Sequence, residues 1–563
     1  MKNGLYSLLS LLLTLNVVDL SVAKNASLVV DLGYAEYQGV LNDNTSNVDF
    51  LGIRYAKPPT GALRWKAPQY PDPVPGIQLA NSQPPLCPQA FGGISQSNPF
   101  RNLSGAVSRR DIPGLPPNQD EDCLYLNVHV PGSQFNGADA TYNDAQGLPV
   151  VVYIHGGGFV FGGISNASFP GSVGGYDGED LLRNANNGVI AVIIQYRLGL
   201  FGWMAGESIK ADGDLNQGLL DQQFALRWVQ QHISKFGGDP SRVTIWGESG
   251  GGGSVLTHIV ANDGCTEPPL FKGAISSSGV LVPYLPYNHP IPETLYTQVV
   301  EQANCSGSQN TLACLRAADV TVLAAANLQV NDEGYIGTYP FGPVIDGTFL
   351  TQRPTQLLSA GKINKVEKFL GVHNSDEGTI FLLGNNVTSL VDFTENLFSA
   401  MSENNIAEVS SLYSGLAPTV AAQSALVYGE STFVCPTYYY LETLHGIAYK
   451  GMFAVAPAFH TADVFYYFNT SLQSAEIPKF NNQSFQQAFA QGFLTFASSK
   501  DFNPNGKFDQ TITPEWPLWD SQNSEMVFNR SADGLPAVGV VSSDEGLLSR
   551  CRFWHSVTNE TFQ

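Results

Sequence analysis

A serine flanked by glycines lies near the middle of the chain, in the run Gly247-Glu248-Ser249-Gly250-Gly251. The apolar residues Val243 to Trp246 come directly before it and predict a buried strand that ends at this serine. A serine on such a tight strand-to-helix turn is lifted out of the sheet, and only glycines tolerate the crowding two residues to either side. The five-residue motif alone is weak evidence, because chance produces it in long chains. Its place after a strand and before another glycine favours a nucleophile for acyl transfer.

A second glycine-rich segment could supply donors for the negative charge that develops on an attacked carbonyl oxygen. His155-Gly156-Gly157-Gly158-Phe159 follows a predicted strand, Val150 to Ile154. Consecutive glycines leave backbone N–H groups unshielded, as in oxyanion loops of the HGGG type. A plain flexible loop is the alternative interpretation. A phosphate-binding loop is excluded, because neither GxxxxGK[ST] nor GxGxxG follows a strand.

The elements that must position these motifs are short, continuous apolar runs that end in glycine or polar residues. Val and Ile without alternation predict strands buried on both faces, and hence a parallel sheet covered by helices. The runs are Val150 to Ile154, Val189 to Ile194, Val243 to Trp246 and Phe369 to Val372. Between two of them, Asn216 to Lys235 has helical spacing, which makes a βαβ unit. We therefore predict an α/β fold, with catalytic residues on loops at the carboxyl ends of the strands.

Composition, net charge and length limit the kind of protein this chain can be and the partners it can bind. The chain has 563 residues, 43% hydrophobic and 14% charged, which excludes a mostly disordered protein. The net charge of −21 disfavours nucleic acids and anionic lipid headgroups. The length alone suggests several domains, but large α/β enzymes often form one unit, and no repeat or clear linker is present.

The N-terminus predicts secretion. Met1 to Ala23 contains Lys2, the apolar run Leu8 to Leu13 and the small-residue cleavage pattern Ser21-Val22-Ala23, as secretory signal peptides do. A membrane anchor is the alternative, but the apolar run is short and no second apolar stretch of about 20 residues follows. The last residues show neither a GPI signal nor a retention signal. We expect an extracellular protein without a stable membrane anchor.

Sequons and cysteines agree with an oxidising, glycosylating route. The ten Asn-x-Ser/Thr sequons are at Asn25, Asn44, Asn102, Asn166, Asn304, Asn386, Asn469, Asn482, Asn529 and Asn559. The seven cysteines show no CxxC spacing, and no HExxH motif occurs, so we expect disulfides and no metal site. The odd number leaves one thiol unpaired.

Four segments together resemble the type-B carboxylesterase/lipase family, which includes the cholinesterases. Phe236 to Gly251 looks like the nucleophile signature of that family, and Glu121 to Val128 resembles its second signature. Gly52 to Pro59 and Tyr196 to Gly199 also fit, and the resemblance runs from near residue 30 to Trp554. It implies an α/β-hydrolase fold over residues 24–563 as a single domain with insertions, most like secreted fungal-type lipases and carboxylesterases.

The family order of catalytic residues is serine, acid, histidine, so the acid and the base should follow Ser249. By resemblance the acid is Glu377, in the polar turn after the predicted strand near Phe369, with Asp376 as the fallback.

Three histidines follow Glu377. His460 matches the His-x-x-acid-x-x-Phe pattern of the family and lies on a loop after an apolar run. His445 is interpreted as a helix-surface residue and His555 as structural.

The resemblance implies acyl transfer without a cofactor. His460 removes the proton of Ser249, Glu377 holds the imidazole, and water then hydrolyses the acyl-enzyme. The backbone N–H groups of Gly157, Gly158 and Gly250 would bind the oxyanion. Gly250 departs from the family, which usually has Ala there; a backbone donor should survive this change, with a looser turn.

The resemblance also implies the disulfides Cys87–Cys123, Cys305–Cys314 and Cys435–Cys551, which leave Cys265 free. In family lipases the first loop, 87–123, is a flap over the active site. It mixes apolar and charged side chains, which fits an amphipathic lid and a plain surface loop about equally. These side chains are Phe91, Ile94, Phe100, Leu103, Val107, Arg101, Arg109, Arg110 and Asp111.

The substrate is expected to be a small-molecule or lipid ester with an apolar acyl or alcohol group. No Trp occurs between Cys87 and Cys123, where cholinesterases hold quaternary ammonium, which argues against a choline-ester specialist. A sterol, carotenoid or feruloyl esterase is the alternative within this chemistry. A non-catalytic adhesion protein on the same scaffold is disfavoured, because Ser249, Glu377 and His460 are all present and no transmembrane tail follows.

Overall fold

The computed structural model describes residues 28–101, 116–135, 147–165, 172–173, 175–474, 479–505, 511–520 and 522–563. The predicted signal peptide, residues 1–23, lies outside these ranges. So do the sequons at Asn25, Asn102 and Asn166, and the flap residues Leu103, Val107, Arg109, Arg110 and Asp111.

A mixed sheet of 11 strands forms the centre of the molecule, in the order β18-β17-β15-β14-β11-β10-β7-β9-β6-β4-β3. The strands from β17 to β9 in this order are parallel, and the pairs at both edges are antiparallel. The bounds are β3 Val40–Leu41, β4 Val48–Arg54, β6 Tyr125–Val130, β7 Leu148–Ile154, β9 Ile190–Ile194, β10 Gly238–Glu248, β11 Gly273–Ser277, β14 Lys368–Asn374, β15 Ala448–Phe453, β17 Ser524–Arg530 and β18 Pro536–Ser542.

Smaller sheets lie outside this centre. They are formed by β1 Val29–Asp31 with β2 Glu36–Gln38 and β5 Ile77–Leu79, by β12 Leu285–Pro286 with β13 Val344–Ile345, and by β8 Ser172–Val173 with β16 Gln473–Ser474.

Each central strand is buried on both faces, as its unbroken apolar sequence predicted. In β7, Val150 and Val152 belong to one core, whereas Val151 and Tyr153 belong to a second core on the opposite face. This division follows from the alternation of side chains along a strand. Helices α5 (Gln217–His232), α6 (Gly250–Val260) and α15 (Cys435–Thr443) contribute to the first core. Helices α2 (Gly178–Asn184), α16 (Val464–Tyr467) and α17 (Gln483–Ser498) contribute to the second.

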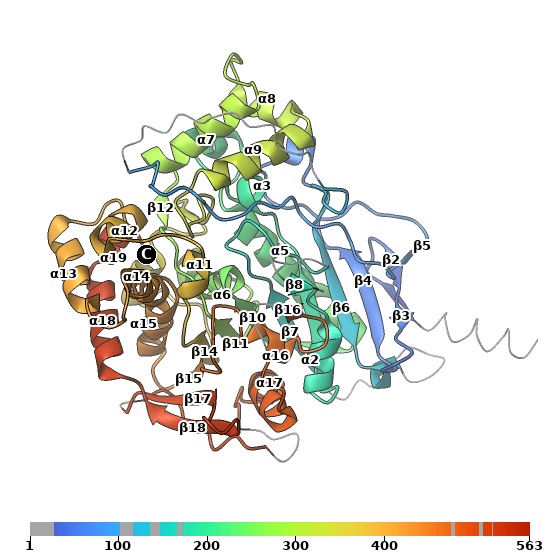
Figure 1. The fold of residues 1–563 in the computed structure, drawn as a ribbon. Helices are drawn as coiled ribbons and strands as arrows, with labels where there is room; N and C mark the ends of the chain where they lie inside the picture. Colours follow the sequence, from blue (N-terminus) through green and yellow to red (C-terminus); the bar gives the residue numbers. More distant parts are fainter. Residues whose placement is uncertain are drawn as a thin grey trace, which may run out of the picture.

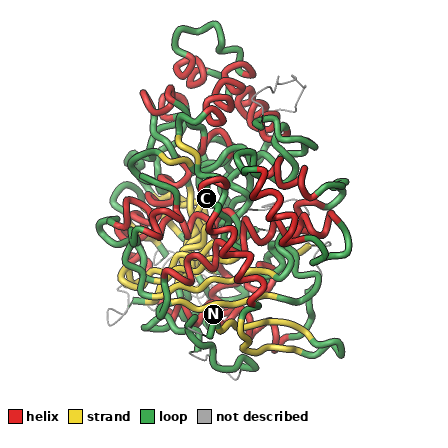
Figure 2. Tube along the Cα trace, turned by 90° about the vertical axis from the view of Figure 1, so that its left-hand side faces the viewer, coloured by secondary structure: helices red, strands yellow, loops and turns green. Residues whose placement is uncertain are grey.

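Among the remaining helices, α10 and α18 pack against α15, and α7, α8 and α9 lie at one end of the molecule. Figure 1 shows α7, α8 and α9 together, far from the edge strands β17 and β18. Figure 2, turned by 90°, shows strands in the lower part and a helical upper part. The bounds are α3 Gly199–Trp203, α4 Glu207–Asp212, α7 Pro290–Gln302, α8 Thr311–Ala317, α9 Val320–Asp332, α10 Pro354–Ser359, α11 Thr379–Leu382, α12 Leu390–Leu397, α13 Glu403–Tyr413, α14 Val420–Gly429, α18 Glu545–Ser556 and α19 Thr558–Thr561.

The four predicted strands are β7, β9, β10 and β14, and the predicted βαβ helix is α5. The α/β class is thus confirmed, with a large, mostly parallel sheet covered on both faces. Helix α5 ends at His232, three residues earlier than the periodicity suggested, because residues 233–236 continue as a 3-10 turn that stops at Gly237 (φ 83°).

Three disulfides join the pairs that the family resemblance implied: Cys87–Cys123, Cys305–Cys314 and Cys435–Cys551. Cys265 is an exposed free thiol. Within the described chain, no helix by itself has the length and apolar composition of a membrane span; α8 and α9 reach these values only as a pair bent by 115°.

Candidate active site

Ser249 lies on a sharp turn between β10 and α6. Its backbone has φ 56° and ψ −122°, a conformation that non-glycine residues rarely adopt. A Cβ at Gly247 would lie 2.2 Å from the carbonyl oxygen of Gly251, and a Cβ at Gly251 would lie 2.0 Å from that of Ile154. Both glycines are therefore required by close backbone approach, as the motif predicted.

The three predicted side chains meet at the carboxyl ends of β10, β14 and β15. The Ser249 Oγ lies 2.8 Å from Nε2 of His460, and Nδ1 of His460 lies 2.5 Å from Oε2 of Glu377. All three residues are buried, with at most 7% of their surface exposed. His460 thus joins Ser249, which lies 211 residues earlier in the chain, to Glu377, which lies 83 residues earlier, in one continuous hydrogen-bonded path.

Glu377 is held rigidly by its other oxygen. Oε1 accepts a hydrogen bond from Ser278 Oγ at 2.7 Å and another from the Asn374 backbone N–H at 2.5 Å. The fallback acid, Asp376, does not face the histidine. Its carboxylate accepts from the Thr379 N–H, while its own N–H donates to the carbonyl oxygen of Ala458 and so ties the histidine loop to this turn.

His460 packs against two aromatic rings that also contact each other. The ring centroids of Phe433 and Phe381 lie 4.3 Å and 5.1 Å from the imidazole, which fixes its plane. His445 is exposed in the turn after α15 rather than on the helix, because α15 ends at Thr443. His555 is exposed on α18, 4.7 Å from the ring of Tyr439.

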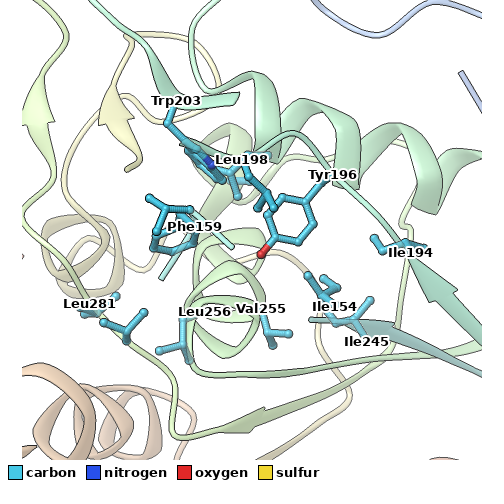
Figure 3. Close-up of a cluster of buried hydrophobic side chains, with 14 of the residues drawn as sticks. Ile154, Phe159, Ile194, Tyr196, Leu198, Trp203, Ile245, Val255, Leu256 and Leu281 are labelled. Atoms are coloured by element: carbon cyan, nitrogen blue, oxygen red, sulfur yellow. The ribbon is translucent and has the colours of Figure 1, made fainter. Parts of the chain in front are cut away.

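The HGGG segment is anchored by the residues at its two ends. The ring of Phe159 lies in the apolar cluster of Figure 3, and its centroid is 4.8 Å from that of Trp203. His155 stacks on Tyr196, whose hydroxyl donates to the His155 carbonyl oxygen at 2.8 Å. Burial lowers the pKa of His155 to about 4, so this imidazole is neutral. An anchored loop can present its N–H groups without reorganising during the reaction.

Glycines line the space beside the nucleophile. Gly157 and Gly158 have φ values of 103° and 58°. A Cβ at Gly250 would lie 3.2 Å from the backbone nitrogens of both Gly158 and Phe159. The glycine that replaces the usual Ala of the family therefore relieves a tight contact with the predicted oxyanion loop.

Two buried carboxyl groups near His460 were not singled out from the sequence. Oε1 of Glu248 lies 3.5 Å from His460 Nε2, and burial, followed by the charges of Asp463 and Glu377, raises the Glu248 pKa well above its usual range. Asp463 accepts from Asn374 Nδ2 at 2.9 Å, and burial raises its pKa to about 6. The only signals in the sequence were their places inside the serine and histidine motifs.

An apolar pocket with a volume of about 160 Å³ opens beside Ser249. Its walls come from the loop after β11, the start of α7, the Tyr339 segment, α11 and the helical bulge 430–434. Phe100 of the Cys87–Cys123 loop also lines it. In this loop Phe91 and Ile94 are exposed by 49% and 59%. This arrangement suits an ester whose acyl or alcohol part is apolar.

Among the described residues, one histidine–carboxylate cluster has donor atoms within 4.8 Å of one another: Asp49, His129 and Glu179. It lies on β4, β6 and α2, and His129 Nδ1 is hydrogen-bonded to Asp49 at 2.7 Å. None of these elements carries Ser249, Glu377 or His460.

The model of the carboxylesterase family matches residues 26–535. This chain belongs to the carboxylesterase family. Secreted lipase 1 of Botryotinia fuckeliana is 38% identical over 61% of the chain and 59% of its own length. Lipase 4 of Diutina rugosa is 34% identical over 75% of the chain and 79% of its own length.

The crystal structure of Aspergillus niger EstA superposes with a TM-score of 0.79 at 27% identity, covering 95% of this chain and 99% of that one. The protein is therefore a member of a family of carboxylic-ester hydrolases with the α/β-hydrolase fold, as the sequence motifs implied.

Proposed function

We propose that this protein is a secreted carboxylic-ester hydrolase that forms an acyl-enzyme on Ser249 and acts on esters with apolar acyl or alcohol groups. The observation that carries the proposal is the hydrogen-bonded path from Ser249 through His460 to Glu377, buried beside an apolar pocket. Nucleophile, base and orienting carboxylate in this geometry are what ester hydrolysis through an acyl-enzyme needs.

In the first half of the reaction, His460 Nε2 accepts the Ser249 proton as Oγ attacks the ester carbonyl. Glu377 holds the tautomer with the proton on Nδ1 and stabilises the imidazolium that forms. The N–H groups of Gly157, Gly158 and Gly250 stabilise the oxyanion, and His460 then protonates the departing alcohol. Loss of one such donor generally lowers kcat by roughly 10²–10³.

In the second half, His460 activates a water molecule, which attacks the acyl-enzyme, and the acid leaves as Ser249 regains its proton. Glu377 keeps His460 oriented through both halves of the reaction, because Ser278 and Asn374 donate hydrogen bonds to its other carboxylate oxygen and hold the side chain in place. No step of this sequence uses a bound cofactor.

Export to the extracellular space is the second part of the proposal. The three disulfides, the signal-peptide pattern and the sequons support it, and so do two relatives whose names describe them as secreted, Secreted lipase 1 of Botryotinia fuckeliana and Secreted triacylglycerol lipase LIP1 of Gibberella zeae. Among the described sequons, four asparagines are exposed: Asn44, Asn304, Asn386 and Asn559.

The test of the chemistry is labelling with an organophosphate followed by peptide mass spectrometry. We expect one adduct, on Ser249, and its loss in Ser249→Ala together with a fall in kcat on the order of 10⁶. A matched control is Ser241→Ala, an exposed serine earlier on β10. An adduct elsewhere, or none, would refute the site.

Esterase and lipase behaviour are separated by comparing soluble short-chain esters with emulsified long-chain esters. The exposed Phe91 and Ile94, next to the pocket wall, favour action at an oil surface. A rise in rate above the solubility limit supports a lipase, and its absence supports an esterase that works on dissolved substrates.

A further inference from the structure

One wall of the substrate pocket is formed by residues far from all the catalytic motifs. Glu560 and Thr561 at the end of α19, and Phe562 and Gln563 after it, line the same pocket as Ser249. Thr561 and Gln563 are buried, each with 1% of its surface exposed, whereas Phe562 is half-buried. Figure 1 shows this segment beside α12 and α14. A segment so deeply placed is part of the pocket's architecture.

Gln563 ties this segment to two other pocket walls. Its Nε2 donates to the carbonyl oxygen of Leu281 at 2.7 Å and to that of Ser431 at 2.9 Å. Leu281 belongs to the loop after β11, and Ser431 to the helical bulge whose Phe433 packs on His460. Thr355 Oγ1 donates to the Gln563 carbonyl oxygen. The side-chain amide thus joins two walls of the pocket, the loop after β11 and the helical bulge 430–434.

Glu560 ties the segment at its other end. Its carboxylate accepts hydrogen bonds from the Ser402 backbone N–H and from Asn405 Nδ2, both at 2.8 Å, at the start of α13. The carbonyl oxygen of Phe562 accepts from the Tyr284 N–H at 2.6 Å. The backbone on both sides of the Phe562 side chain is therefore held, while its ring has no hydrogen-bonding role.

Phe562 has a left-handed backbone, with φ 60° and ψ 28°. This conformation is strained for a bulky residue and persists only where surrounding contacts fix it, as happens at ligand sites. Its ring lies 5.7 Å from His289, directly before α7, whose Ile291 also lines the pocket. The fixed backbone places a large apolar side chain at the pocket wall.

We propose that Phe562 is a specificity-determining residue, whose ring limits the length of the acyl chain that Ser249 can accept. The inference rests on the proposed function, because it assigns the pocket to the acyl group. It predicts that the volume at position 562 changes chain-length preference and leaves the chemistry at Ser249 unchanged.

The experiment measures kcat/KM for p-nitrophenyl esters from acetate to palmitate, in the parent protein, Phe562→Ala and Phe562→Trp. Active sites are counted with an organophosphate. For Phe562→Ala we expect the long-chain to acetate ratio to rise by a factor of about four for each methylene that gains apolar contact. For Phe562→Trp the same ratio should fall, and acetate should change little in both.

The matched control is Phe553→Ala, on α18, which removes a phenylalanine outside the pocket lining and should leave the profile unchanged. If Phe562→Ala yields no titratable sites, Phe562→Leu and Phe562→Trp decide, since a profile equal to the parent's in both overturns the inference. A parent protein that is not labelled on Ser249 refutes the proposed function instead. A labelled parent with an insensitive profile refutes only the role of Phe562.

Discussion

Replacing Asp463 by Asn tests how the buried charges around His460 affect stability. The Asp463 side chain is fully buried and accepts from Asn374 Nδ2 at 2.9 Å and from the Tyr467 hydroxyl at 3.3 Å. Burial is the main cause that raises its pKa from 3.8 to about 6, and the charge of Glu377 adds to it. The asparagine has nearly the same shape, can accept the Asn374 hydrogen bond and never ionises.

The sign and size follow from proton linkage. Because the folded-state pKa lies above the unfolded value, the native protein holds this proton more tightly, and the free energy of unfolding falls as pH rises from 4 through 6. A difference of about two pH units corresponds to about 3 kcal/mol above pH 6. We expect Asp463→Asn to be more stable than the parent by about 2–3 kcal/mol at pH 7.5, and by close to zero at pH 4.

The assay is urea unfolding followed by tryptophan fluorescence at several pH values between 4 and 7.5. The quantity compared is the difference between variant and parent, because carboxylates common to both then cancel. Asp533→Asn, at an exposed position, is the control and should give no pH-dependent difference. If the difference in free energy of unfolding between Asp463→Asn and the parent does not grow with pH, ionisation of Asp463 does not destabilise the native protein. That result would refute the reasoning.

Three further predictions concern the hydrogen-bonded path from Ser249 to Glu377, the disulfide Cys435–Cys551, and the hydrogen-bonded pair of His129 and Asp49. Glu377→Gln keeps the shape of the side chain but cannot stabilise the imidazolium, so kcat for a soluble ester should fall about 10⁴-fold; a fall below tenfold in titrated enzyme would contradict its role. Replacing Cys435 and Cys551 by Ala opens a loop of 116 residues and should lower the free energy of unfolding by roughly 3–5 kcal/mol, measured by urea unfolding; an unchanged midpoint would argue against this. Burial acts to lower the pKa of His129, but the hydrogen bond and charge of Asp49 raise it to about 9. The parent should therefore lose stability between pH 6.5 and 9, and His129→Gln should not, as thermal unfolding across this range will show.

The central strands could be predicted because burial on both faces leaves a direct record in sequence. Val150 to Ile154 has no polar residue, and the structure places its alternate side chains in two separate cores. The predicted bounds of the strands were less exact. The strand before Ser249 begins at Gly238, five residues before the apolar run, because Gly238 already pairs with Leu148 of β7, ahead of an irregularity in the pairing that spans the polar residues 239–242.

In the active site, too, some features could be predicted from the sequence and others depend on the packed structure. Ser249 could be named from a motif with local steric requirements, whereas Glu377 and His460 were named from their resemblance to motifs of the family. Glu248 and Asp463 belong to those motifs too, but their raised pKa values depend on how completely other segments exclude water from them. Loss of solvent is a property of the packed molecule, and no spacing of residues encodes it.

The sequence by itself determined which residues carry reactive groups and where the chain must turn tightly, since a side chain at Gly247 would clash with the backbone of Gly251, four residues further on. Only the tertiary structure decided that Phe562 stands in the same pocket as Ser249, more than 300 positions earlier. Contacts between distant segments arise from the packing of the whole chain, because shape complementarity and burial are settled only when all the elements are in place.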